Sequence, residues 1–269
     1  MVEFHRALIR YGHQSQLHLS AEDNLPEHDY VITYSDNPRI DYLCKQAKKV
    51  IVYQLSYGMA LEREGKVVCH HDTIVCCSTM HLVNRISINT PKNIHYIGHS
   101  QESTINQFYP EDTIHNRRIF DVAIMIHRSP DKRFFEAFEY CKSQGMKIIL
   151  FGARNTQFNL SGANRIIFNA SPDQVRWVFS NSKKYVNLSI TEGLNRPGIE
   201  AMLCGCKPYI VDGCEIYKDK ENCRIIKKVE EISDNFEICD YITIKDELKK
   251  YTWKNVLMNL GRILGKDLL

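Results

Sequence analysis

The chain has 269 residues, of which 43% are apolar and 25% charged, and a formal net charge of +3. This length can bury the core of one large or two modest domains, and the composition is that of an ordinary soluble protein. The small net charge does not argue for nucleic acid or a membrane surface as a partner, and no apolar run reaches the roughly 18 residues that a membrane-spanning helix needs.

The first half of the chain begins with an amphipathic helix, expected over residues 2–11 and ended by Gly12. A strand is expected to follow at 15–19. Beyond it, short β-rich runs alternate with helical segments. Further strands are expected at 30–34, 50–54, 73–77 and 93–97, and helices at 39–49 and 80–86.

The polar segment 98–117 lacks clear periodicity and is expected to connect two domains. The second half again alternates strands with helices. Strands are expected at 121–126, 147–151, 165–168, 185–190, 208–211 and 241–244, and helices at 130–143, 172–180, 197–204 and 251–264. Because continuous apolar strands of this kind suit a parallel sheet covered on both faces, the expected fold class is α/β.

The most informative stretch of the chain runs from Thr191 to Pro208. Pro197 suits the first position of a helix, since its missing N–H has no partner there in any case. Gly205 falls where the helix would end in a left-handed residue. With the strands before and behind it, this stretch predicts a strand–loop–helix–strand unit of a parallel sheet.

Two carboxylates flank the Gly-rich turn of this unit: Glu192 in the loop and Glu200 in the first turn of the helix. A helix N-terminus offers unpaired N–H groups and a positive dipole end, which together suit a diphosphate. Each carboxylate could bind a pair of sugar hydroxyls. The combination predicts a nucleotide-sugar site; the alternative is that both glutamates are solvated charges at a helix end.

At these residues the chain resembles the retaining GT-B glycosyltransferases of the family-4 type. Their signature is Glu, seven residues, Glu, then a helix ending in Ala-Met-x-x-Gly and a following Pro. The positions that match are Glu192, Glu200, Ala201, Met202, Gly205 and Pro208. Two further segments are similar to the family: 124–133, at the first strand of its carboxy-terminal domain, and 251–264, its closing helix.

The resemblance implies an α/β fold of GT-B architecture, with two Rossmann-like domains and a cleft between them. The amino-terminal, acceptor-side domain is expected at 1–105 and the carboxy-terminal, nucleotide-sugar-binding domain at 106–250. A closing helix within 251–269 would pack back toward the amino-terminal domain. Family members precede the helix that corresponds to 2–11 with a strand and a Gly-rich turn, so a truncated amino-terminal domain lacking that first strand is expected here.

The resemblance also implies how the donor would bind. Glu200 would hold the ribose hydroxyls of the nucleotide, and Glu192 would hold the donor sugar. The loop backbone that completes this site for sugar and phosphates would be that of Gly193, Leu194, Asn195 and Arg196.

Cations would stabilise the leaving diphosphate. Lys132 takes the position of the family's lysine, and the arginine position falls on His127, with Arg128 immediately after it. Either Arg128 serves after a local shift of register, or His127 replaces the cation. The catalytic candidates are therefore Glu192, Lys132 and Arg128, and no metal ion is expected in the site.

The predicted function is transfer of a sugar from a nucleotide-sugar donor, such as a UDP- or GDP-sugar, to an acceptor hydroxyl with retention of anomeric configuration. The alternatives are a non-catalytic GT-B protein that binds nucleotide-sugars and a nucleotide-sugar epimerase. The acceptor stays open between glycan, lipid, protein and modified nucleic acid. No cofactor is expected. The ten cysteines are expected to be buried, reduced thiols of a cytoplasmic protein, with peripheral membrane contact left open.

Overall fold

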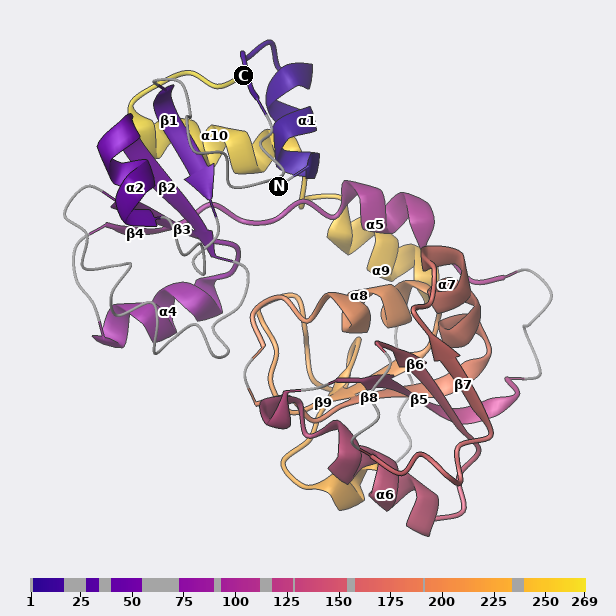
Figure 1. The fold of residues 1–269 in the computed structure, drawn as a ribbon. Coiled ribbons are helices and arrows are strands. Elements are labelled where there is room, and N and C mark those ends of the chain that lie inside the picture. Colours follow the sequence, from indigo (N-terminus) through magenta and orange to yellow (C-terminus); the bar gives the residue numbers. More distant parts are fainter. Residues whose placement is uncertain are drawn as a thin grey trace. The chain divides into compact units, whose positions relative to one another are not determined.

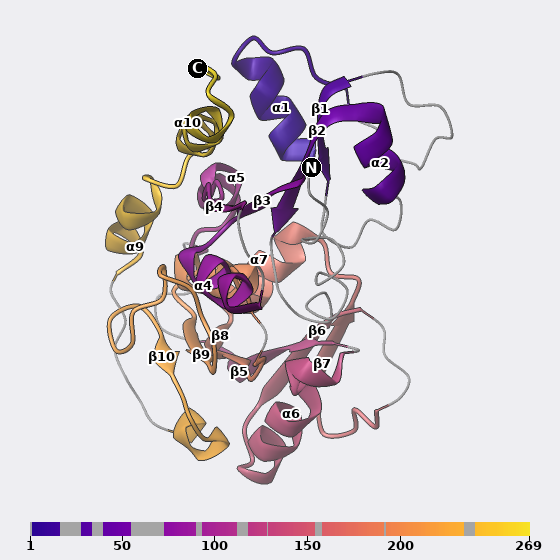
Figure 2. The same ribbon diagram turned by 90° about the vertical axis from the view of Figure 1, so that its left-hand side faces the viewer.

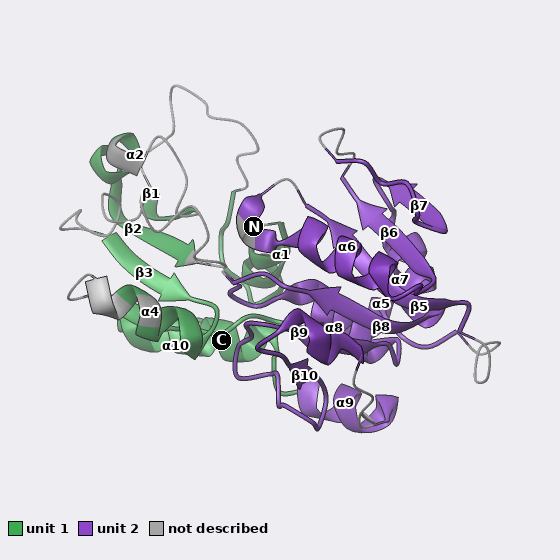
Figure 3. Ribbon diagram, turned by 90° about the horizontal axis from the view of Figure 1, so that it is seen from below, with its two compact units in different colours: residues 1–100, 250–269 green, residues 101–249 purple. Residues whose placement is uncertain are grey.

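The chain forms two compact α/β units, seen here in a computed structural model (Figure 3). One unit contains residues 1–100 and 250–269, and the other residues 101–249. The residues that the structure describes are 2–16, 28–33, 40–54, 73–89, 93–111, 118–127, 129–153, 158–190, 192–233 and 240–269.

The first unit is built on a four-stranded parallel sheet with the strand order β1-β2-β3-β4 (Figure 1). Its strands are β1 (His28–Thr33), β2 (Ala47–Gln54), β3 (Thr73–Cys77) and β4 (Ile94–Tyr96). The strand expected at 15–19 does not appear at residues 15 and 16, and the rest of it lies outside the described residues.

Helices cover both faces of this sheet because side chains alternate along each strand. Ile51 and Tyr53 face α1 (Val2–Arg10) and α10 (Trp253–Leu264), where the rings of Phe4 and Trp253 meet edge to face at 5.2 Å. Val50 and Val52 face the other side, which α2 (Ile40–Gln46) and α4 (Met80–Asn89) cover. The last helix of the chain therefore completes the core of the first unit.

The second unit contains a six-stranded parallel sheet with the strand order β10-β9-β8-β5-β6-β7. Its strands are β5 (Phe120–Ile126), β6 (Ile148–Gly152), β7 (Arg165–Phe168), β8 (Ser182–Asn187), β9 (Lys207–Ile210) and β10 (Arg224–Ile225). Counted from β5, this is the doubly wound order 3-2-1-4-5-6, which reverses direction between β5 and β8. Ligands of such sheets bind beyond the carboxyl ends of the strands at this switch point.

The helices of the second unit lie on both faces of its sheet, with α6 (Phe134–Ser143) on one side and α7 (Pro172–Ser180) and α8 (Arg196–Leu203) on the other (Figures 1 and 2). Phe134 and Phe138 of α6 pack on the face that carries Val122 and Ile124. On the opposite face, Phe179 of α7 meets the rings of two strand residues, Phe151 and Tyr185, at 5.3 Å each. The expected α/β class with covered parallel sheets is confirmed.

One sequence-based assignment is wrong, and one segment contains a helix that the sequence did not indicate. The strand expected at 241–244 is the start of helix α9 (Tyr241–Leu248), because Asp240 caps it by accepting the N–H groups of Ile242 and Thr243 at 2.8 and 3.1 Å. The connection expected at 98–117 contains helix α5 (Glu102–Gln107). In both places the apolar pattern was too short to decide between helix, strand and loop.

Element boundaries also differ from expectation. The helix expected over 39–49 ends at Gln46, since β2 already begins at Ala47. The helix expected over 130–143 is divided into a 3-10 turn, Pro130–Lys132, and α6, because Arg133 adopts a left-handed φ of 45°. Strand β8 begins and ends three residues before the expected 185–190. None of the helices in the described part of the chain is long and apolar enough to cross a bilayer.

Candidate active site

Three of the expected donor-binding residues, His127, Lys132 and Glu192, meet beyond the carboxyl ends of β5 and β8, at the switch point of the six-stranded sheet. His127 directly follows β5, and Lys132 ends the 3-10 turn that comes next. Asn187 is the last residue of β8, and Glu192 lies in the loop between β8 and α8. Because β5 and β8 are paired neighbours, these two loops lie side by side.

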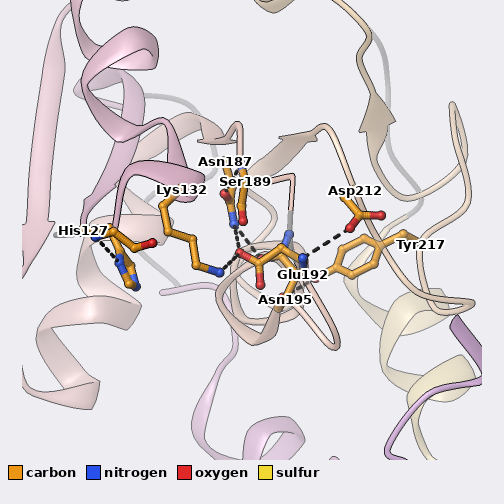
Figure 4. A network of polar contacts seen from close by, with 9 residues as sticks. His127, Lys132, Asn187, Ser189, Glu192, Asn195, Asp212 and Tyr217 are labelled. Carbon is orange, nitrogen blue, oxygen red and sulfur yellow. Dashed lines mark hydrogen bonds and ion pairs between the residues drawn. The ribbon is translucent and has the colours of Figure 1, made fainter. Parts of the chain in front are cut away.

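An ion pair between Lys132 and Glu192 is the centre of the site (Figure 4). Lys132 Nζ donates to Glu192 Oε1 at 2.7 Å, and the two side chains are only 20% and 12% exposed. Asn187 Nδ2 donates to the same oxygen at 3.1 Å. The carboxylate that was expected to face the donor sugar is therefore held by two donors from two different elements.

The loop after Glu192 is fixed at the point where α8 begins. Asn195 is the residue before the helix and adopts a left-handed φ of 45°, a conformation that asparagine tolerates better than most residues. Its carbonyl oxygen accepts from the hydroxyl of Tyr217 and from the N–H of Gly198. A Cβ on Gly198 would overlap the Tyr217 hydroxyl, so a glycine is needed for this close approach.

The N-terminus of α8 presents backbone donors that have no acceptor in the described part of the chain. The N–H of Glu192 is taken by Asp212 Oδ2 at 3.2 Å. Among the described residues, no acceptor takes the N–H groups of Gly193, Leu194 and Asn195. Unpaired N–H groups and the positive end of a helix dipole favour an anion at this place.

A cavity of about 170 Å³ opens beside these groups. Its polar lining includes His127, Lys132, Asn187 and Glu192, and its apolar lining includes Ile124 and Leu188. Complete small-molecule sites measure roughly 300–1,000 Å³, so this cavity has room for a part of a nucleotide-sugar. All of its lining residues belong to the second unit.

Glu200 was expected in the first turn of α8 but lies just beyond it, at the start of the second turn, and its side chain is not solvent-facing. It is the fifth residue of the helix, and its side chain is only 13% exposed. Its carboxylate forms an ion pair with Arg196, whose Nε lies 3.4 Å from Oε1. Burial raises the pKa of Glu200 to about 7, although the charge of Arg196 acts in the opposite direction.

His127 is not a ready substitute for the family's arginine. Burial lowers its pKa, the nearby Lys132 lowers it further, and the charge of Glu192 opposes the shift. At neutral pH the imidazole is therefore mostly uncharged and can donate or accept a hydrogen bond without supplying a cation. Arg128 lies outside the described residues, so its role as the second cation stays a prediction.

Sequence reasoning missed Asn187, Asp212 and Tyr217, which hold the loop in place. Asn187 could have been noticed as a polar residue within the apolar run Tyr185-Val-Asn-Leu188. Tyr217 and Asp212 reach the loop from beyond β9, and no local pattern shows this. Within the described ranges, no three His, Cys, Asp or Glu side chains gather as metal ligands would.

No protein-family model matches the sequence, and no curated protein matches it. The structure, in contrast, is similar to those of solved proteins. Sucrose-phosphate synthase from Thermosynechococcus elongatus matches with a TM-score of 0.66 at 10% identity, over 88% of this chain and 73% of the other. The lipopolysaccharide outer core galactosyltransferase WaaB matches with 0.61 at 16% identity, over 87% and 75% of the two chains.

A third similar structure is HepE from Anabaena in complex with UDP-glucose, which matches with a TM-score of 0.55 at 13% identity. The match covers 85% of this chain and 70% of HepE. At such identities the likeness shows the fold. It is the GT-B architecture, with two Rossmann-like units.

Proposed function

We propose that this chain is a retaining glycosyltransferase of the family-4 type, which transfers a sugar from a nucleotide-sugar to an acceptor hydroxyl. The observation that carries the proposal is the Lys132–Glu192 pair at 2.7 Å, set beside the N-terminus of α8 at the switch point of the sheet. A cation, a carboxylate and unpaired N–H groups within one site suit a ligand that joins an anionic diphosphate to a hydroxyl-rich sugar.

The diphosphate would lie at the N-terminus of α8. The N–H groups of residues 193–195, which have no acceptor among the described residues, and the ammonium of Lys132 would donate to its oxygens. Glu200, further along the same helix, would accept the ribose hydroxyls, and Glu192 would accept hydroxyls of the sugar. Because the anion would be neutralised by protein donors, donor binding would need no divalent metal ion.

The same groups would act in the reaction. As the bond between the anomeric carbon and the diphosphate breaks, negative charge grows on the departing oxygen, where Lys132 and the N–H groups stabilise it. The acceptor oxygen would form its bond on the same face of the sugar, so the configuration is retained. The proton of the acceptor hydroxyl would pass to the departing diphosphate.

The complex of HepE with UDP-glucose supports a UDP-sugar as the first donor to test, with GDP-sugars next. A cytoplasmic location is part of the proposal. Eight cysteines in the described part of the chain are free thiols and seven of them are buried, which suits a reducing compartment.

The test is to incubate the purified protein with UDP-, GDP- and ADP-sugars and to measure both binding and release of the nucleotide. We expect binding of one nucleotide class and slow donor hydrolysis that yields the sugar in its original anomeric form. Binding without any turnover would indicate a non-catalytic binding protein, and conversion of one nucleotide-sugar into another would indicate an epimerase. Absence of binding to every donor would contradict the proposal.

A further inference from the structure

Asn187 joins the two ends of the loop that leads into α8, and nothing in the sequence motif assigns it a role. It is the last residue of β8, half-buried, and its side chain lines the cavity. We propose that Asn187 is a positioning residue that fixes Glu192 and Asn195 for recognition of the donor's sugar. This inference rests on the proposed function.

The orientation of the Asn187 amide is set by its partners. Its Oδ1 accepts the N–H of Ser189 at 2.9 Å, so its Nδ2 must face the loop. The two hydrogens of Nδ2 are donated to Glu192 Oε1 at 3.1 Å and to Asn195 Oδ1 at 3.0 Å. Rotating the amide by half a turn would place Nδ2 against the Ser189 N–H and Oδ1 against the Glu192 carboxylate. No other orientation therefore satisfies the three contacts.

This arrangement leaves an unpaired donor. Because Asn195 Oδ1 faces Asn187, Asn195 Nδ2 points away from it, and this atom is buried without a hydrogen-bond partner among the described residues. An unpaired buried donor destabilises a fold, and native proteins contain few of them. The network is therefore better explained by the geometry that it gives to the loop than by a gain in stability.

Asn187 is expected to act in recognition of the sugar but not in recognition of the nucleotide. Glu192 Oε1 is shared between Lys132, which is expected to turn to the diphosphate, and Asn187, which is anchored on a strand of the sheet. When Lys132 leaves, Asn187 still holds the carboxylate where the sugar binds. Loss of Asn187 should therefore affect recognition of the sugar and spare recognition of the nucleotide.

The first test compares the dissociation constants of a nucleotide-sugar and of its nucleoside diphosphate for wild type and Asn187→Leu, a replacement of similar size without hydrogen-bonding groups. We expect Asn187→Leu to weaken nucleotide-sugar binding by about tenfold, as for one lost hydrogen bond to a charged group, and to change nucleotide binding by less than about twofold. The matched control is Asn164→Leu. Asn164 Oδ1 accepts the Ile148 N–H at 2.7 Å, at the opposite ends of the strands, and its loss should change neither constant.

Two outcomes of this test contradict the inference. Equal dissociation constants for wild type and Asn187→Leu would show that the amide does not position Glu192 and Asn195 for sugar binding. An equal loss for both ligands would show a merely structural role. If wild type binds neither ligand, the proposed function fails and the inference falls with it; if wild type binds both and Asn187→Leu behaves like wild type, the inference alone fails.

A second variant, Asn187→Asp, gives a readout that a structural role would not produce. When protonated, the introduced carboxyl can donate to Glu192 Oε1 and still accept from Ser189, but when ionised it faces the Glu192 carboxylate. Lys132, His127 and Tyr185 are the other titratable side chains of this cavity, and Asp212 and Glu200 lie beside it. Because Glu200 has a pKa of about 7 in wild type as well, each measurement on the variant is divided by the wild-type value at the same pH. Relative to wild type at each pH, sugar recognition by Asn187→Asp should fall as pH rises from about 5 to about 8, and a ratio independent of pH would overturn the inference.

Discussion

The loop before α8 and helix α8 itself each bury one glutamate, Glu192 in the loop and Glu200 in the helix. The electrostatic surroundings of the two carboxylates are opposite. The two carboxylates are almost equally shielded, with 12% and 13% of the side chain exposed. Glu192 accepts from Lys132 at 2.7 Å and from Asn187 at 3.1 Å. For Glu200, the partner in the described part of the chain is Arg196 at 3.4 Å, and the pKa is raised to about 7.

The difference shows that burial alone does not determine what a carboxylate does. A buried carboxylate with strong donors has its oxygens satisfied by the protein, whereas one with weak compensation costs free energy until a ligand supplies hydrogen bonds. Glu192 is thus held in position, and Glu200 is left ready to bind. In the proposed function, the ribose hydroxyls would provide the hydrogen bonds that Glu200 lacks in the free protein.

The largest expected effect is on stability, from Glu200→Gln. The folded protein raises the pKa of Glu200 from 4.5 to about 7, so the fold favours the neutral acid. Below pH 4.5 the acid is neutral in both states and the two proteins should be equally stable. As pH rises through about 7, wild type should lose about 3 kcal/mol relative to Glu200→Gln. Urea unfolding at pH 4.5 and 8 measures this, and a difference that does not grow with pH would contradict it.

The next effect is on binding, from Lys132→Ala. The change removes the proposed cation for the diphosphate and leaves Glu192 without its ion-pair partner, so nucleotide binding should weaken by about 2 to 3 kcal/mol. Calorimetric titration with UDP and GDP measures the loss. The control is Lys183→Ala, because Lys183 also pairs with a carboxylate at 2.7 Å but is 57% exposed. If both variants bind like wild type, Lys132 does not contact the diphosphate.

Glu200→Gln should also weaken nucleotide binding, by about 1.5 to 2 kcal/mol, because a neutral amide replaces a charged acceptor for the ribose. The same substitution would then stabilise the free protein and weaken its complex. Titrations at pH 8, where wild-type Glu200 is mostly ionised, give the clearest comparison. Equal nucleotide affinities of wild type and Glu200→Gln would mean that Glu200 does not bind the ribose. Its raised pKa would then reflect only its burial in the fold.

The smallest expected effect is that of removing divalent metal ions. Since Lys132 and the N–H groups at the start of α8 would neutralise the diphosphate, nucleotide binding in EDTA should equal binding in magnesium or manganese. Titrations in the three buffers check this. Binding that needs the metal would mean that the protein donors at α8 are insufficient.

The sequence predicted much of the second unit because local signals determine it. Pro197 and Gly205 mark the ends of α8 in the sequence, and Gly205 does adopt a left-handed φ of 69°. Strand 165–168 and helix 172–180 of this unit were placed at their observed bounds, as was strand 73–77 of the first unit. The helix at 241–248 was missed because its first residues, Tyr241-Ile-Thr-Ile, favour a strand, while the capping Asp240 decides for a helix.

The site was only partly predictable because its geometry depends on contacts between distant segments. The motif indicated Glu192, Glu200 and Lys132, but not that the first and last of these form an ion pair. The raised pKa of Glu200 follows from the packing of α8 in the second unit, which no local pattern reveals. The role of Asn187 depends on the loop folding back to place Asn195 beside it.

The most direct test of the central claim is a crystal structure of this protein with the nucleoside diphosphate that binds it best. The account predicts diphosphate oxygens within hydrogen-bonding distance of the N–H groups of residues 193–195. It also predicts that Lys132 Nζ has turned to the diphosphate while Asn187 still donates to Glu192 Oε1. A nucleotide bound elsewhere, or bound with the Lys132–Glu192 contact unchanged at 2.7 Å, would contradict it.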